Sequence, residues 1–193
     1  MLAITEIAES VLENSNIPDY SKKSWHTKLA AITPGFIEFD EKRRKNSVHI
    51  YSEIRGQVEL DIAGWKINIT AIADRIEINQ SGIATILDYK TGVVPTKKEI
   101  LSGLSPQLLV EAIILSEGGF AIESEKVHKL AYVKINSSKP YIKTTEIALT
   151  QNDLLKHKQG LVTLLEHYIN TKKFVVEASL MKYDDYSHLA RRL

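Results

Sequence analysis

The stretches KINITAIADRIEI, residues 66–78, and IATILDYKT, residues 83–91, decide the fold of this chain. Both alternate β-branched or apolar residues with polar ones, which is typical of strands, and the NQSG segment between them is typical of a tight turn. If the turn is centred on Ser81, the hairpin pairs Ile76 with Ile86 and Ile78 with Ala84. These apolar pairs predict an antiparallel unit with one buried face.

The same register places two carboxylates opposite each other on that apolar face. Asp74 pairs with Asp88, and Lys90 lies two residues further along the same face. At an effective dielectric of about 20, carboxylates about 5 Å apart repel by roughly 3 kcal/mol. Lys90 compensates part of this repulsion, and a hard cation such as Mg²⁺ or Mn²⁺ compensates it more completely. In the alternative interpretation, both aspartates are strand-end residues, one of them ion-paired and the other solvated.

The segments before the hairpin add a third strand and two helices. Residues 48–62 have the same strand pattern, and Ala63-Gly64 marks a turn, so we expect a three-stranded antiparallel meander. Apolar residues at helical spacing predict helices over residues 2–13 and about 25–45. Pro34 and Gly35 predict an interruption of the second helix.

The segments after the hairpin alternate helix, strands and helix. Ser105 and Pro106 are expected as the N-cap and first position of a helix that ends at Gly118. Two strands follow near 127–135 and 141–149. Thr150 and Asp153 resemble a capping box that opens a helix to about residue 171, with an apolar side formed by Leu154, Leu155, Leu161, Leu165 and Tyr168. We therefore expect one α/β (α+β) domain over residues 1–193, with a mostly antiparallel mixed sheet flanked by helices and an extended polar tail.

The helix expected to begin at Pro106 has an unusual polar stripe. The segment SPQLLVEAIIL is apolar nearly all round, except for Gln107 and Glu111, which lie four residues apart on one face. A buried polar stripe needs partners, whereas a stripe on a half-buried helix would face solvent. Both interpretations remain open from the helix alone.

Composition excludes several classes of protein. The chain has no cysteine, which rules out disulfides, thiolate metal sites and cysteine nucleophiles. Its six histidines show no metal-ligand spacing such as HExxH, and a net charge of +1 gives no overall basic footprint for nucleic acid. Glutamates interrupt the first 13 residues where a signal peptide would be apolar, and no run is long enough to span a membrane, so we expect a cytoplasmic protein.

The order ADRIE, DYKTG, PQLLVEA resembles the RecB-like branch of the PD-(D/E)XK nuclease superfamily, with its restriction-endonuclease-like core. In that branch one strand carries an aspartate, the next carries aspartate-x-lysine, and a following helix carries a glutamine. These features correspond to Asp74, to Asp88 with Lys90, and to Gln107. The chain resembles most closely the C-terminal nuclease domain of AddB-type proteins, through Glu41 with Arg43 and Arg44, the PQL-x-x-EA helix, Gly118-Gly119-Phe120 and the closing DYSHLARR.

The resemblance implies a metal-dependent DNA nuclease, expected to be an exonuclease, that acts in double-strand break repair and recombination. Asp74, Asp88 and the main-chain carbonyl of Tyr89 would bind Mg²⁺ or Mn²⁺. Lys90 would orient or deprotonate the attacking water or stabilise developing charge, and Gln107 would position the phosphate or a water. Weaker candidates for the site are Glu53 and Glu111. The implied partners are DNA and a helicase subunit of the AddA or RecB type.

Two departures from the RecB-like pattern keep a second function open. The glycine- and histidine-bearing helix that contributes to the metal site in that branch has no counterpart here, since neither His26 nor His49 has a matching context. Many relatives also have a tyrosine where this chain has Glu111. The alternative is a non-catalytic nucleic-acid-binding or scaffold module on the same fold. A small-molecule hydrolase on an unrelated fold would need a site that the sequence does not show.

Overall fold

The computed structural model describes residues 2–124 and 126–171. The tail that we expected to be extended and the DYSHLARR motif lie outside the described residues. Five helices and five strands make up the described part of the chain, in the order α1 (Leu2–Glu13), α2 (Asp19–Lys45), β1 (His49–Ile62), β2 (Trp65–Ile78), β3 (Ile83–Lys90), α3 (Lys97–Leu101), α4 (Gln107–Ser116), β4 (Lys126–Ile135), β5 (Ile142–Ala148) and α5 (Gln151–Thr171).

The strands form one sheet in the order β1-β2-β3-β4-β5. Every neighbouring pair is antiparallel except β3 and β4, which are parallel. Parallel neighbours need a long crossover, and here α3 and α4 supply it. This confirms the expected fold class, a mixed α+β domain whose mostly antiparallel sheet is flanked by helices, consistent with a restriction-endonuclease-like fold. None of the described helices is long and apolar enough to cross a membrane.

The β2–β3 hairpin has the register expected from its apolar residues. Ile76 pairs with Ile86 and Ile78 with Ala84. The Asn79 side chain fixes the turn, because its Oδ1 accepts hydrogen bonds from the backbone N–H of Ser81 and of Ile83. The backbone ladder between these strands ends at the pair Arg75 and Leu87, one pair short of the level of Asp74 and Asp88.

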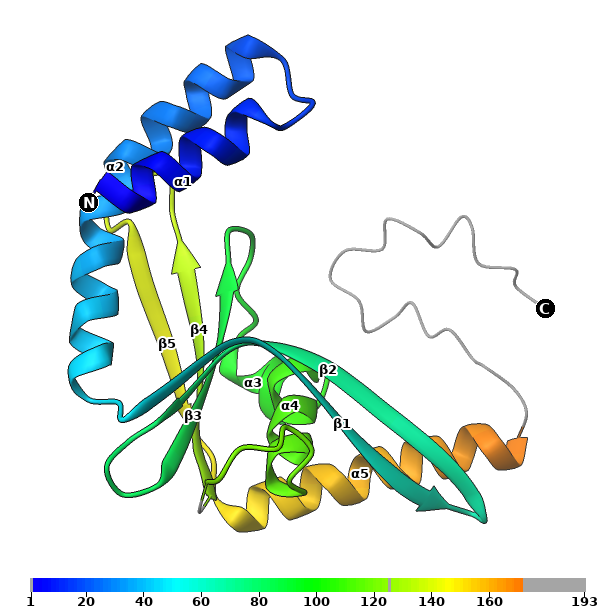
Figure 1. The fold of residues 1–193 in the computed structure, drawn as a ribbon. Coiled ribbons are helices and arrows are strands. Elements are labelled where there is room, and N and C mark those ends of the chain that lie inside the picture. The colour runs from blue at the N-terminus through cyan, green and yellow to red at the C-terminus, as the bar shows by residue number, and fades with distance from the viewer. Residues whose placement is uncertain (1, 125, 172–193) are drawn as a thin grey trace.

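The two faces of the sheet carry different helices (Figure 1). Helix α4 packs on one face, where alternate residues of β2 and β3 such as Ile76, Ile78 and Ile86 join the main apolar core. Helix α2 lies along β5 on the other face, over a smaller cluster that includes Leu87 and Val133. Neighbouring residues of a strand point to opposite faces. Asp74 and Asp88 therefore lie on the α4 face, and Arg75 and Tyr89, which follow them, lie on the α2 face.

Helix α2 differs from the expectation, because it continues through Pro34 instead of breaking there. A proline removes one backbone donor and crowds the preceding turn, which bends a helix without always ending it. Figure 1 shows α2 changing direction between its blue half, which pairs with α1, and its cyan half, which lies along the sheet.

Two smaller expectations were also wrong, and one short helix was missed. Ser105 is not the cap of α4; Pro106 occupies that position and makes no side-chain cap. Leu155 is 54% exposed, because α5 packs on the core mainly through Leu154 and Leu161. Helix α3 was not anticipated, although Thr96 and Glu99 form a capping box at its start. Five residues give too little apolar periodicity to predict such a helix.

Candidate active site

Asp88, Lys90 and Gln107 form a closed ring of polar contacts where β3 ends and α4 begins. The Lys90 ammonium donates to Asp88 Oδ1 and to Gln107 Oε1, each at 3.0 Å. Gln107 Nε2 completes the ring by donating to Asp88 Oδ1. Lys90 Nζ also lies 2.9 Å from Asp88 Oδ2, without the alignment of a hydrogen bond. The Asp88 side chain is 3% exposed and that of Lys90 is 32% exposed, so the lysine connects a buried carboxylate with solvent.

Asp74 lies beside the ring, on the neighbouring strand, and binds the main chain next to Asp88. Its Oδ2 accepts a hydrogen bond of 2.9 Å from the backbone N–H of Tyr89. The β2–β3 ladder has already ended at this level, so the aspartate side chain holds the two strands together in place of a main-chain carbonyl. Asp74 therefore lies beside the main chain of Tyr89, the residue that follows Asp88.

Glu111 lies one helical turn after Gln107 and is buried, with 1% of its surface exposed. Gln107 Nε2 lies 3.4 Å from Glu111 Oε1, while Glu111 Oε2 has no hydrogen-bond partner among the described residues. Burial raises the pKa of Glu111 to about 8, and the nearby charges of Asp88 and Asp74 act in the same direction. The Glu111 carboxyl group is therefore mostly protonated at neutral pH when no cation is bound.

Burial also raises the pKa of Asp88 above its usual range. The Lys90 ammonium opposes this effect, the charge of Asp74 adds to it, and the Gln107 hydrogen bond opposes it. The charge of Asp74 thus raises the pKa of Asp88, and the charges of Asp74 and Asp88 raise the pKa of Glu111. A bound cation would relieve this electrostatic situation.

Tyr132 is a residue of this cluster that the sequence did not reveal. The parallel register of β3 and β4 places Tyr132 beside Asp88. Its side chain is 1% exposed, and its ring centroid is 6.0 Å from the Lys90 ammonium. Alternation in β4 could have placed Tyr132 on a buried face, but no local pattern specifies which strand β4 pairs with.

The structure brings together five of the residues expected at the site: Asp74, Asp88, Lys90, Gln107 and Glu111. Tyr89 contributes main chain at the same position. Glu53, the other weak candidate, is not among these residues; it is exposed and has a φ of 51°. The β1–β2 register would place it across from Asp74, but the ladder skips this position between the pairs Ser52–Arg75 and Ile54–Ala73.

The cluster fits a hard divalent cation in part. Within residues 2–124 and 126–171, no group of three or more carboxylate or imidazole side chains is placed to hold a metal ion. Mg²⁺ commonly uses one or two carboxylates and completes its shell with water and substrate phosphate oxygens. Asp74, Asp88 and the Tyr89 carbonyl offer such a set of oxygen donors, and the unpartnered Oε2 of Glu111 lies in the same buried region. The donor chemistry therefore suits Mg²⁺ or Mn²⁺ with an open coordination sphere.

Two strands and a helix thus bring acidic, lysine and glutamine side chains together in one cluster. A profile of the PD-(D/E)XK nuclease superfamily matches residues 2–179. The chain belongs to this superfamily, whose members are nucleases, generally dependent on divalent metal ions.

Similar proteins occur in Rickettsia. An uncharacterized protein of Rickettsia bellii is 48% identical over 201 residues, and one of Rickettsia felis is 44% identical over 223 residues. These alignments cover 97% and 98% of this chain but only 24% and 26% of the relatives, so the chain spans about a quarter of their length. A crystal structure of a candidate exonuclease from Eubacterium rectale is 16% identical with a TM-score of 0.48, over 81% of this chain and 58% of the other.

Proposed function

We propose that this domain is a divalent-metal-dependent DNA nuclease that hydrolyses phosphodiester bonds at the Asp74–Asp88 cluster. The observation that carries the proposal is the ring of Asp88, Lys90 and Gln107, with Asp74 bound to the adjacent main chain. Membership of the nuclease superfamily supports the reaction class, because this cluster contains the residue types that such hydrolysis needs.

Asp74, Asp88 and the Tyr89 carbonyl would hold the metal ion. When bound, the ion supplies Lewis-acid chemistry, lowering the pKa of a water and neutralising phosphate charge. Lys90 orients the attacking water or stabilises charge on the phosphate, since its ammonium is the cation of the cluster and reaches solvent. Gln107 holds Lys90 through its carbonyl oxygen and Asp88 through its amide, so it fixes both relative to the phosphate.

The finer assignment extends the resemblance to AddB-type nuclease domains. On this proposal residues 1–193 form one nuclease domain of a cytoplasmic helicase-nuclease, which removes nucleotides from DNA ends during double-strand break repair. The much greater length of the Rickettsia relatives is compatible with further domains beside this one. A helicase subunit of the AddA or RecB type would be the partner that delivers DNA.

Cleavage of labelled DNA tests the proposal. Linear and circular DNA, single- and double-stranded, is incubated with the protein in Mg²⁺, Mn²⁺ or EDTA. We expect metal-dependent loss of linear DNA, abolished by Asp88→Ala and by Lys90→Ala. Lys66→Ala is the matched control, because Lys66 is also ion-paired with a carboxylate, Glu59 at 2.7 Å, but lies on the exposed surface of the β1–β2 hairpin.

Each outcome separates the alternatives. Cutting of circular DNA would exclude a strict exonuclease. A folded wild type that binds DNA but cuts none of the substrates in any metal would contradict the proposal and favour the non-catalytic module. Cutting that persists in Lys90→Ala and Asp88→Ala would place the active site elsewhere.

A further inference from the structure

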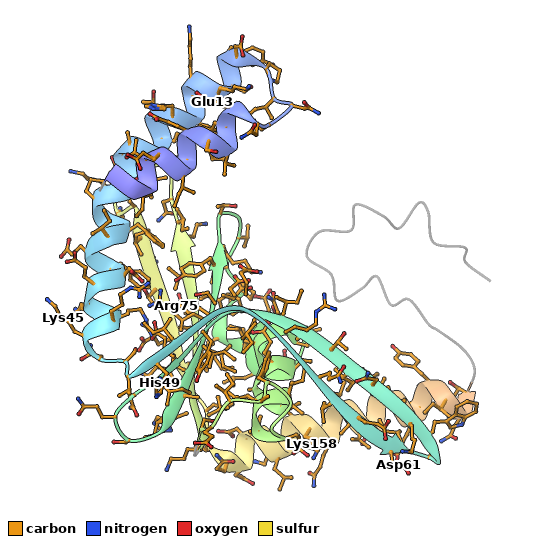
Figure 2. The ribbon with its side chains drawn as sticks, in the orientation of Figure 1. Glu13, Lys45, His49, Asp61, Arg75 and Lys158 are labelled. Atoms are coloured by element: carbon orange, nitrogen blue, oxygen red, sulfur yellow. The ribbon has the colours of Figure 1, made fainter. Side chains whose placement is uncertain are left out.

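A network of buried charges lies directly behind the candidate active site, on the α2 face of the sheet. Arg75 is 4% exposed and Glu77 is 5% exposed, and Arg75 Nε lies 2.8 Å from Glu77 Oε1. Helix α2 contributes Asp40, which accepts from Arg75 Nη1, and Arg43, whose Nη2 lies 2.7 Å from Glu77 Oε2. Figure 2 shows Arg75 between the sheet and the cyan half of α2.

This network connects to both strands of the active site. Arg75 is the next residue after Asp74, and its Nη1 lies 3.4 Å from the hydroxyl of Tyr89, the next residue after Asp88. In a strand, a side chain held on one face fixes the backbone that aims the neighbouring side chain at the other face. Arg75 and Tyr89 on the α2 face therefore set the positions of Asp74 and Asp88 on the α4 face.

The backbone leaves this positioning to side chains. In the described part of the sheet, Asp74 has no partner in the β1–β2 ladder or in the β2–β3 ladder. The hydrogen bond from the Tyr89 N–H to Asp74 bridges β2 and β3 on the active-site face, and the Arg75–Tyr89 contact bridges them on the opposite face. Asp74 is also an expected metal ligand, so its carboxylate cannot be the sole connection that fixes the distance between β2 and β3. The Arg75–Tyr89 contact supplies the second connection.

We propose that Arg75, held by Asp40 of α2 and in contact with the Tyr89 hydroxyl, is a positioning residue that sets the spacing of the Asp74 and Asp88 metal ligands. This inference rests on the proposed nuclease function and deepens it, because it makes α2 a support of the metal site. Residues that orient metal ligands from behind typically change metal affinity by about 10-fold to 100-fold when they are replaced.

Metal affinity measured directly, without DNA, tests the inference. Titration calorimetry or the electron paramagnetic resonance of free Mn²⁺ gives the dissociation constant for wild type, Tyr89→Phe, Asp40→Asn and Arg75→Gln. Tyr89→Phe keeps the main-chain carbonyl and the ring and removes only the hydroxyl bridge. Arg75→Gln removes a buried cation from between Asp40 and Glu77 and can unfold the domain, so the two milder variants keep the test decisive.

The control removes charge from the same network at its far end. Glu146 contacts Arg43 at 3.3 Å and Lys129 at 2.9 Å, without touching Arg75. We expect Glu146→Gln to lower the melting temperature at least as much as Tyr89→Phe does, while leaving the metal dissociation constant unchanged. Tyr89→Phe and Asp40→Asn should raise that constant about tenfold or more and should speed hydrogen exchange at the Tyr89 N–H.

The outcomes distinguish this inference from the proposed function. Variants of Tyr89 and Asp40 that bind Mn²⁺ as tightly as an active wild type would overturn the positioning role alone and leave a structural network. A wild type that binds no divalent cation would overturn the proposed function and the inference with it.

Discussion

Glu111 shows how strongly the protein environment acts on a single side chain of the site. It lies in the apolar core beneath α4, with a glutamine as its hydrogen-bond partner and two aspartates nearby, and these surroundings raise its pKa to about 8. In the unfolded chain the same group titrates near 4.5. The folded state therefore holds a proton between these two pH values that the unfolded state has released.

This difference predicts the sign of a pH effect on stability. Because the folded-state pKa of Glu111 is raised, its contribution is most favourable below pH 4.5 and is lost as the pH rises toward 8. In EDTA, we expect the Glu111 contribution to lower the free energy of unfolding by about 1.4 kcal/mol per pH unit across this window. Glu111→Gln should remove that contribution, as measured by urea unfolding at several pH values; equal pH slopes for wild type and variant would contradict the expectation.

The sequence was sufficient to group most of the candidate site and insufficient for one of its members. Asp74, Asp88 and Lys90 could be grouped because a tight turn and apolar pairs specify the hairpin register locally. Tyr132 could not be grouped with them, because it reaches the site through a parallel pairing between strands separated by two helices. Glu53 could not be placed because its left-handed φ interrupts the ladder, which alternation does not anticipate.

At the scale of elements, turn signals and periodicity located every strand and the long helices. The Thr150–Asp153 capping box opens α5 as expected: Asp153 Oδ2 accepts from the Thr150 N–H, and Thr150 Oγ1 accepts from the Asp153 N–H. The course of α2 could not be predicted locally, because its contacts with the sheet decide whether a helix continues through Pro34. The apolar side of α5 was only partly correct, since packing selects Leu154 and leaves Leu155 exposed.

The end of α4 meets the β1 strand at a place where only glycine fits. A Cβ added at Gly119 would overlap the main-chain carbonyl of Gln57, and the Gln57 N–H donates to the Gly119 carbonyl at 2.9 Å. One residue earlier on β1, a Cβ at Gly56 would overlap the Phe120 ring. This close approach of Gly119 to Gln57 anchors α4, and with it Gln107, against the β1–β2 hairpin.

Two glycine substitutions test this close approach. Gly119→Ala should destabilise the domain by about 1–3 kcal/mol or more, because backbone atoms must move to admit the methyl group. Gly160→Ala in α5 is the matched control, since nothing lies within 4 Å of its added Cβ, and it should stabilise the helix by roughly 1 kcal/mol. Thermal unfolding measures both, and equal effects of the two substitutions would refute the proposed close packing.

At the scale of the whole molecule, the sheet is the layer that connects the two functional faces. Helix α4 carries Gln107 and Glu111 on one side, and α2 carries Asp40 and Arg43 on the other. Figure 1 shows α1 and the blue half of α2 standing beyond the ends of β4 and β5, while α5 runs beneath the other end of the sheet. The ion pairs between α2 and β2 join these layers.

We propose that residues 1–193 unfold as one cooperative unit, and the two tryptophans can test this. Trp25 lies on α2 and Trp65 begins β2. The variant Trp65→Phe keeps only Trp25, which reports on the helical hairpin formed by α1 and α2. The variant Trp25→Phe keeps only Trp65, which reports on the sheet. Fluorescence and far-ultraviolet circular dichroism should give the same midpoint within each variant. A separate, earlier transition seen only by Trp25 would show that the helical hairpin is an independent unit.

The most direct measurement of the central claim is the position of Mn²⁺ in crystals of the domain, located by its anomalous scattering. We predict a peak bordered by the Asp74 and Asp88 carboxylates and the Tyr89 carbonyl, at metal–oxygen distances of about 2.0–2.2 Å, and its loss in Asp88→Ala. A crystal that shows no manganese there, at a concentration that supports DNA cleavage by the same protein, would contradict the assignment of this cluster as the nuclease site.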